Sequence, residues 1–176
     1  MAITKLIGSS LTNDTINATQ LDETANYDFT GTVTGAGESN APYFLARINT
    51  SQSVSSGTPT KLEYNNEILD SSSSYDTSTS RWTPQTAGKY FIFHQWSVNT
   101  STDCYSLSAI MKNGSNVFRF NGRNFDTDSL LCQGIIDLNG STDYVEAKGY
   151  HEAGTSLTNP TNINTCYFGG YLISTT

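Results

Sequence analysis

The chain has 176 residues, of which 36% are hydrophobic and 14% charged, with a net charge of −7 and an isoelectric point of about 4.6. Its nine Lys and Arg residues are scattered singly, so we expect no basic patch of the kind that binds nucleic-acid phosphates. No apolar run approaches the roughly 18 residues of a membrane span, so membrane insertion is not expected either.

Residues 1–40 differ from the rest of the chain and predict an extended arm. They are polar, with isolated apolar residues such as Ile3, Leu11 and Leu21, and they end in the glycine-rich run GTVTGAG. An arm with so little core of its own needs a partner to hold it. The apolar stretch at the start is too short for a secretory signal, so we expect synthesis in a cytoplasm.

From Ala41 onward the pattern is typical of short β-strands separated by turns, and Ser, Thr and Asn, about a third of the chain, disfavour helices. Lys112–Ser115, with Asn-Gly at its centre, predicts a tight hairpin. Residues 41–176 are therefore expected to form one all-β sandwich or jelly roll. The expected strands lie at residues 43–49, 60–64, 88–98, 104–111, 117–120, 130–138, 143–150 and 165–174, with about nine or ten in all.

The strand at residues 88–98 carries aromatic side chains on both faces. Tyr90, Ile92 and His94 alternate with Phe91 and Phe93. Tyr90 and Ile92 can fill the sandwich core, and Phe91 and Phe93 then need a second cover, from a loop or from another subunit. Oligomerisation is the natural answer.

Tyr64, Asp70, Tyr75, Trp82, Gly88 and Tyr90 stand at intervals of 6, 5, 7, 6 and 2 residues, followed by Ile92 and His94. These intervals resemble the signature of the globular head of complement component 1q and its tumour-necrosis-factor-like relatives. The resemblance covers about Ala41 to Ile173 and implies a ten-stranded jelly roll that assembles as a homotrimer. It also implies that Gly88 and Tyr90 are a turn and a core anchor, and that Phe168 and Ile173 are core residues of the last strand. The departures from the family pattern are Tyr64 and Trp82 where Phe is usual, Ile92 for Phe, and His94 for Phe or Tyr.

The arm is similar to the starts of many tail-fibre and other virion proteins of bacteriophages. This second resemblance implies that residues 1–40 attach the protein to other virion proteins and that residues 41–176 form a knob on the virion surface. The function expected is that of a non-enzymatic structural protein, a tail fibre, spike or capsid decoration, which adheres to a host-surface receptor or glycan. Two alternatives are a carbohydrate-active enzyme of the virion and a cellular secreted binding module.

Few residues are candidates for catalysis, ligand binding or metal binding. His94 is expected to be a packed structural residue, and His151 lacks the second histidine of a zincin helix. Asn121, Phe125 and Tyr150 are candidate ligand-binding residues, with the two aromatic rings as candidates for stacking on sugars, and otherwise they are ordinary loop residues. Asp126 and Asp128, with Asp137 and Asp143 nearby, are weak calcium candidates and otherwise solvated turn carboxylates. No other cofactor and no catalytic residue is predicted.

The three cysteines, Cys104, Cys132 and Cys166, lie far apart in the sequence and show no metal-ligand spacing. We expect three buried free thiols that pack as small apolar residues. The alternative is one bridged pair with one thiol left over.

Overall fold

The computed structural model describes residues 40–126, 129–159 and 165–176, and these residues form β-strands and no helix. None of the described segments is therefore a helix long and apolar enough to cross a membrane. The predicted arm, residues 1–40, lies outside the described residues except for Asn40, so its role stays a prediction. The predicted all-β class is confirmed.

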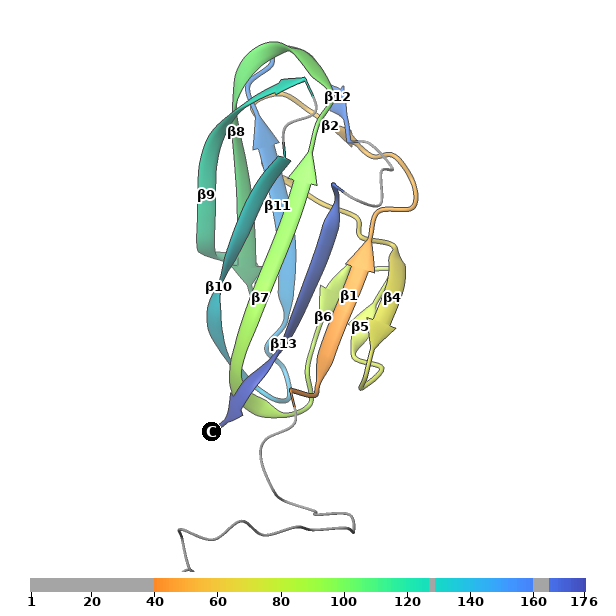
Figure 1. The fold of residues 1–176 in the computed structure, drawn as a ribbon, viewed down its shortest axis with the longest axis vertical. Helices are drawn as coiled ribbons and strands as arrows, with labels where there is room; N and C mark the ends of the chain where they lie inside the picture. Colours follow the sequence, from red (N-terminus) through yellow and green to blue (C-terminus); the bar gives the residue numbers. More distant parts are fainter. Residues whose placement is uncertain (1–39, 127–128, 160–164) are drawn as a thin grey trace, which may run out of the picture. The chain divides into compact units, whose positions relative to one another are not determined.

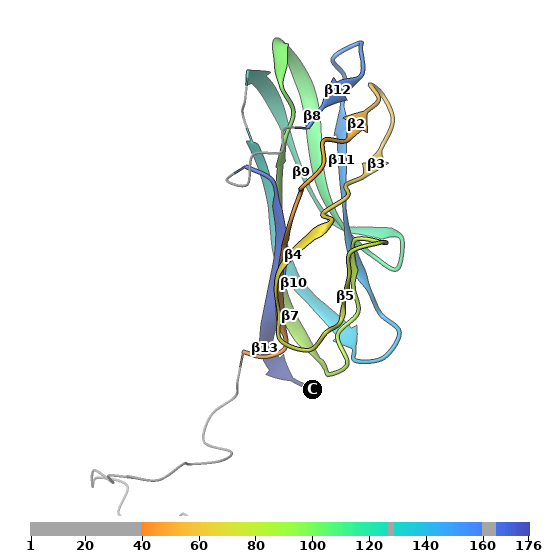
Figure 2. The ribbon, with the colours of Figure 1, turned by 90° about the vertical axis from the view of Figure 1, so that its right-hand side faces the viewer.

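Two antiparallel sheets lie face to face, as Figures 1 and 2 show from the front and from the side. Sheet 1 has the strand order β10-β7-β13-β1-β4, and sheet 2 has the order β5-β6-β11-β8-β9 with β3 paired to β11. These two main paths hold five strands each and so match the predicted ten-stranded jelly roll. The strands of sheet 1 are β1 (Tyr43–Arg47), β4 (Asn66–Asp70), β7 (Ala87–Ser97), β10 (Ser129–Asn139) and β13 (Tyr167–Thr175). The remaining strands are β2 (Ser53–Val54), β3 (Thr60–Lys61), β5 (Tyr75–Asp76), β6 (Arg81–Trp82), β8 (Thr100–Lys112), β9 (Ser115–Asp126), β11 (Val145–His151) and β12 (Leu157–Thr158), of which β2 and β12 pair separately.

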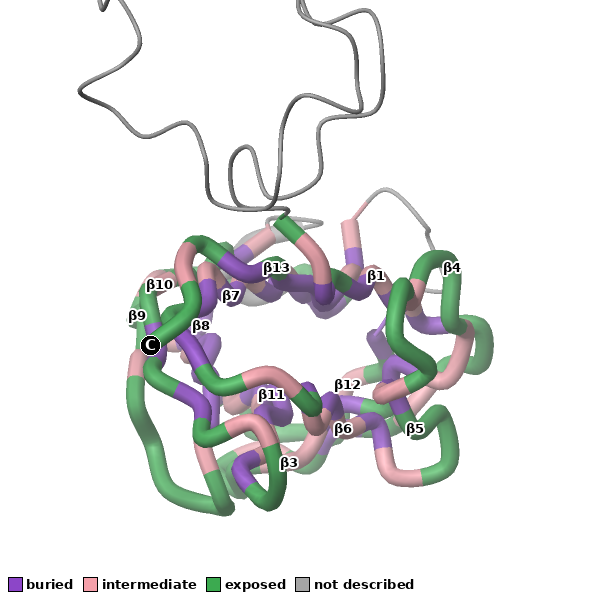
Figure 3. Tube along the Cα trace, turned by 90° about the horizontal axis from the view of Figure 1, so that it is seen from below, coloured by how far each residue is buried: buried purple, intermediate pink, exposed green. Residues whose placement is uncertain are grey.

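The core fills the space between the sheets, and Figure 3 shows buried residues along their facing sides. Phe44 of β1 stacks on Trp82 of β6 with ring centroids 4.5 Å apart, and it meets Phe168 of β13 edge-on at 4.9 Å. Tyr90 of β7 meets Trp82 edge-on at 5.2 Å. These offset and edge-on contacts are the preferred geometries of aromatic pairs, so they tie the two sheets together.

The turn residues explain part of the signature spacing. The carboxylate of Asp70 accepts the backbone N–H of Ser72 at 3.0 Å and of Tyr75 at 2.7 Å, which closes the β4–β5 turn. The hydroxyl of Tyr75 then donates to the carbonyl of Tyr64 at 2.7 Å. The predicted hairpin at Lys112–Ser115 is confirmed, because Asn113 and Gly114 both have positive φ angles, 51° and 80°.

The last strand corrects one expectation. Phe168 is fully buried, but Ile173 is 40% exposed, so the prediction that Ile173 is a core residue is wrong for the single chain. The physical reason is the period of two along a strand, which puts residues five apart on opposite faces. Leu172, which is 2% exposed, takes the core position instead.

Strand β8 turns its small polar side chains toward the core and its more apolar side chains outward. Its apolar residues Tyr105, Leu107 and Ala109 alternate with Ser106 and Ser108, and the serines face the core. The apolar set therefore lies on the outer face of sheet 2, against strands β11 and β9. The serines leave room for large side chains from sheet 1, among them His94 and Trp96, which are both fully buried.

Replacement of Gly149 by Ala is expected to destabilise the fold by about 1–3 kcal/mol. A Cβ at Gly149 would stand 2.8 Å from the indole ring of Trp96, and that ring is held by a 3.2 Å hydrogen bond from its N–H to the carbonyl of Leu107. Urea unfolding measures the loss. The matched control is Gly122→Ala, whose Cβ meets a flexible methyl group of Leu130. An equal loss in both variants would contradict the role of Trp96.

Candidate interaction surfaces

The outer face of sheet 1 carries a continuous row of large apolar side chains. Register pairs place Ile135 of β10, Phe91 of β7, Tyr171 of β13 and Tyr43 of β1 side by side across four strands. The ring of Phe91 lies 5.6 Å from that of Tyr171, and Ile135 is 57% exposed. We call this row, together with Phe93, the aromatic face.

Neighbouring positions widen the aromatic face. The ring centroid of Phe93 lies 6.0 Å from those of Phe91 and Tyr167. On the neighbouring strand β10, Gln133 pairs with Phe93 and stands between Leu131 and Ile135. The prediction that Tyr90 and Ile92 enter the core while Phe91 and Phe93 turn outward is confirmed. A large exposed apolar face of this kind marks a site of protein association.

A second apolar patch lies at the edge where β9 of sheet 2 approaches β10 of sheet 1. Phe120 is 50% exposed there and shares a shallow pocket with Leu131 and Phe118. Phe118 packs tightly over Gly134 of β10, where no side chain would fit. This β9–β10 edge adjoins the aromatic face at Leu131 and extends from there onto β9.

The outer face of sheet 2 holds a larger pocket of about 670 Å³, which we call the outer groove. Its floor is the outward apolar set of β8, Leu107, Ala109 and Met111, and Tyr150 of β11 stands beside it. Its polar lining includes Arg119 of β9 and Lys148 of β11. Pockets with an apolar floor and a few convergent polar groups are typical of small-ligand sites.

The structure brings two of the three candidate ligand-binding residues together. Tyr150 and Asn121 both pair with Leu107, from opposite sides, so they lie in one row across β11, β8 and β9. Both are therefore strand residues, where loop positions were expected. Tyr150 lines the outer groove, while the side chain of Phe125 lies outside the described part of the chain. Arg119 and Lys148 were not predicted as site residues, because only the register of the strands places them near Tyr150.

His94 lies in a fully buried hydrogen-bond chain. Its Nδ1 is 3.0 Å from the hydroxyl of Tyr64, and its Nε2 is 2.6 Å from the hydroxyl of Ser108. Because the Tyr64 hydroxyl donates to the carbonyl of Gln95 at 2.9 Å, the arrangement that satisfies every group has Nδ1–H donating and Nε2 accepting. Burial lowers the pKa of His94 to about 3, so the ring is neutral.

The prediction that His94 is a packed structural residue is confirmed, because neither it nor Ser108 reaches solvent. A serine and a histidine in contact resemble part of a hydrolase triad, but here no substrate can approach the hydroxyl. His151 is also fully buried, and its Nε2–H donates to the carbonyl of Val54 at 2.8 Å. Both histidines therefore serve packing.

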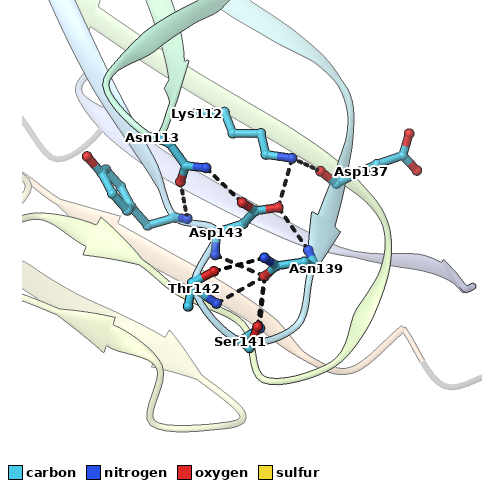
Figure 4. Close-up of polar contacts among 8 residues, drawn as sticks. Lys112, Asn113, Asp137, Asn139, Ser141, Thr142 and Asp143 are labelled. Atoms are coloured by element: carbon cyan, nitrogen blue, oxygen red, sulfur yellow. Dashed lines mark hydrogen bonds and ion pairs between the residues drawn. The ribbon is translucent and has the colours of Figure 1, made fainter.

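The carboxylate of Asp143 and the backbone carbonyl of Asp137 belong to a polar network at the end of β10, shown in Figure 4, while the carboxylate of Asp137 pairs with Lys89. Asp143 accepts from Lys112 at 2.8 Å, from the Asn113 amide at 2.7 Å and from the Asn139 N–H at 3.0 Å. These hydrogen bonds, first of all that from Lys112, hold the pKa of Asp143 below its ordinary value. Asp143 is thus a buried turn carboxylate whose oxygens accept from protein donors, and not the solvated carboxylate that was expected.

The same network fixes the loop between β10 and β11. The side-chain oxygen of Asn139 accepts the backbone N–H groups of Ser141, Thr142 and Asp143, each at 3.0 Å. The other two calcium candidates, Asp126 and Asp128, have side chains outside the described part of the chain. Among the residues that the structure describes, no group of three or more metal-ligating side chains occurs.

All three cysteines are buried and free, so the prediction of three packed thiols is confirmed. Burial raises the pKa of the Cys132 thiol, which keeps it protonated at neutral pH. The alternative of one bridged pair is wrong.

Comparison with known proteins agrees with this geometry at the level of the fold. No protein-family model matches the sequence, and no curated protein matches it. Among solved structures, murine APRIL superposes with a TM-score of 0.56 at 11% identity, over 74% of this chain and 98% of that one. The Eiger TNF of S. frugiperda gives 0.52 at 10% identity, over 76% of this chain and 93% of the other. The globular domain of zebrafish complement 1qA gives 0.53 at 18% identity over 77% of this chain and 99% of that domain, so the chain has the jelly-roll fold of complement 1q heads and tumour-necrosis-factor proteins.

Proposed function

We propose that this protein is a non-enzymatic binding module that assembles as a homotrimer through its aromatic face. The row of Ile135, Phe91, Tyr171 and Tyr43 carries the proposal, because the described residues of one chain leave it without a cover. A ring of identical subunits with head-to-tail contacts needs two different patches on each chain. The aromatic face supplies one patch, and the β9–β10 edge with Phe120 supplies the other.

The trimer is proposed to be a knob on the surface of a phage virion, as a tail fibre, spike or capsid decoration. The resemblance of residues 1–40 to the starts of phage virion proteins supports this role. In the proposal the arm attaches to other virion proteins, and residues 41–176 adhere to a receptor or glycan on the host surface. Light scattering on the purified chain tests the trimer, and antibody labelling of particles tests the location.

Deletion of residues 1–40 is expected to leave a folded trimer that no longer joins particles. The fold should survive, because the described core is built from residues between Phe44 and Leu172. Incorporation is measured by mass spectrometry of purified particles made with the shortened protein, with the full-length protein as control. Incorporation of the shortened protein at the level of the full-length protein would refute the attachment role of the arm.

A further inference from the structure

A row of positive side chains crosses sheet 2, and two of them, Arg119 and Lys148, line the outer groove. Register pairs place Lys61 of β3, Lys148 of β11, Ala109 of β8 and Arg119 of β9 next to one another on one face of sheet 2. Neighbouring strands lie about 4.8 Å apart, so Lys148 and Arg119 flank Ala109 with backbones about 10 Å apart. Three of the nine Lys and Arg residues of an acidic chain therefore share one row.

None of these three cations forms an ion pair within the described residues, and two of them have no side-chain hydrogen bond either. Arg81, Lys89, Lys112 and Arg123 each form an ion pair with a carboxylate. Lys61 donates to the carbonyl of Thr79 at 2.8 Å. Lys148 and Arg119, by contrast, have no ion pair or side-chain hydrogen bond within the described residues. Two like charges on either side of a small side chain repel each other, and a bound anion would relieve that repulsion.

The next rows of the groove are aromatic and polar. Tyr105 and Tyr150 meet edge-on with ring centroids 6.1 Å apart, and the hydroxyl of Tyr150 donates to Glu152 at 2.6 Å. That hydrogen bond fixes the Tyr150 ring and leaves the carboxylate of Glu152 with further acceptor capacity for hydroxyl donors. The floor of Leu107, Ala109 and Met111 is apolar. A fitting ligand therefore has a ring with an apolar face, several hydroxyls and a negative group.

We propose that the outer groove binds an acidic saccharide, with the carboxylate of one sugar between Arg119 and Lys148 and a sugar ring against Tyr150. A guanidinium can bind a carboxylate through two parallel hydrogen bonds, which makes Arg119 the specific contact and Lys148 the supporting charge. The groove opens on the outer face of sheet 2, and its Arg119 also borders the pocket of the β9–β10 edge, so this end of the groove adjoins the proposed trimer contact. The assignment names a ligand class for the adhesion proposed above and rests on that function.

The test measures binding of the full chain to four probes by titration calorimetry at low salt. The probes are tetragalacturonate, its full methyl ester, 3′-sialyllactose and inorganic sulfate. At least one of the two acidic sugars should bind, and for tetragalacturonate the neutral ester should bind at least ten-fold more weakly. Arg119→Gln and Tyr150→Ala should each weaken binding of the acidic sugar at least ten-fold. Lys89→Gln removes the same charge from the other sheet and should leave binding unchanged.

Three results would overturn the assignment. These are no binding of either acidic sugar, equal binding of the acid and the ester, and binding of sulfate as tight as that of the sugars. Unfolding curves of each variant separate lost binding from lost fold. The mass of the same preparation separates the two proposals: a trimer without acid-dependent binding contradicts only the groove, whereas a monomer contradicts the proposed assembly.

Discussion

Phe91→Glu is expected to convert the proposed trimer into folded monomers at micromolar concentration. The side chain of Phe91 packs 5.6 Å from Tyr171 and lies opposite Ile135 on the outside of sheet 1. A carboxylate at this position would be buried without a partner at each of three equivalent interfaces, and each burial costs several kcal/mol. The core is untouched, because its β7 residues Tyr90 and Ile92 point the other way. Size-exclusion chromatography with light scattering measures the mass.

Two further variants make this result interpretable. Ile135→Glu changes a side chain that is 57% exposed and should dissociate the trimer without any effect on the core. Tyr150→Glu places the same charge on an aromatic side chain of the outer groove, on the outer face of sheet 2 and away from the aromatic face and from Phe120, and should leave the trimer intact. Persistence of the trimer in both Phe91→Glu and Ile135→Glu would show that the aromatic face is not the interface.

Much of sheet 1 could be predicted from the sequence, because its strands alternate cleanly. Tyr90 and Ile92 against Phe91 and Phe93 follow the period of two, and the structure keeps that division. The hairpin at Asn113-Gly114 is equally local, since both residues tolerate positive φ. Such features need no knowledge of distant residues. The same period of two along β13 would have placed Leu172, and not Ile173, on the core side with Phe168, whereas the resemblance alone suggested Ile173.

The orientation of β8 could not be predicted in this way. Alternation alone favours an inward direction for Tyr105, Leu107 and Ala109, because they are more apolar than the serines between them. The structure turns them outward, since Ser108 is needed inside as the partner of His94. That requirement comes from the opposite sheet, 14 residues away in sequence. A prediction made for each strand separately cannot include this contact between the two sheets.

The outer groove depends on register between strands that are distant in the sequence. Arg119 could be placed near Ala109 by counting back from the hairpin, but an irregularity at Ile110 and Met111 shifts that count. Lys148 joins them only because β11 pairs with β8. The cations of this row are therefore single, unremarkable charges in the sequence, and only the sheet brings them together.

His94→Leu is expected to destabilise the protein by about 2–4 kcal/mol at pH 7.5, and by about 2 kcal/mol less at pH 5. The loss at pH 7.5 arises because Ser108, which is fully buried, keeps a hydroxyl without its partner. Part of this loss should be recovered in the double variant His94→Leu/Ser108→Ala, which removes the orphaned hydroxyl. Recovery would show that the cost lies in the hydrogen-bond chain and not in ring volume.

The pH dependence follows from the lowered pKa of His94. The folded protein binds this proton only near pH 3, whereas the unfolded chain binds it below about pH 6.5. As pH falls from 7.5 to 5, the unfolded state gains protons that the folded state does not, so the wild-type protein loses stability that His94→Leu keeps. Urea unfolding at equal chain concentration measures the difference between the two proteins. A difference that stays constant between pH 7.5 and pH 5 would mean that His94 is protonated in the folded state as readily as in the unfolded one.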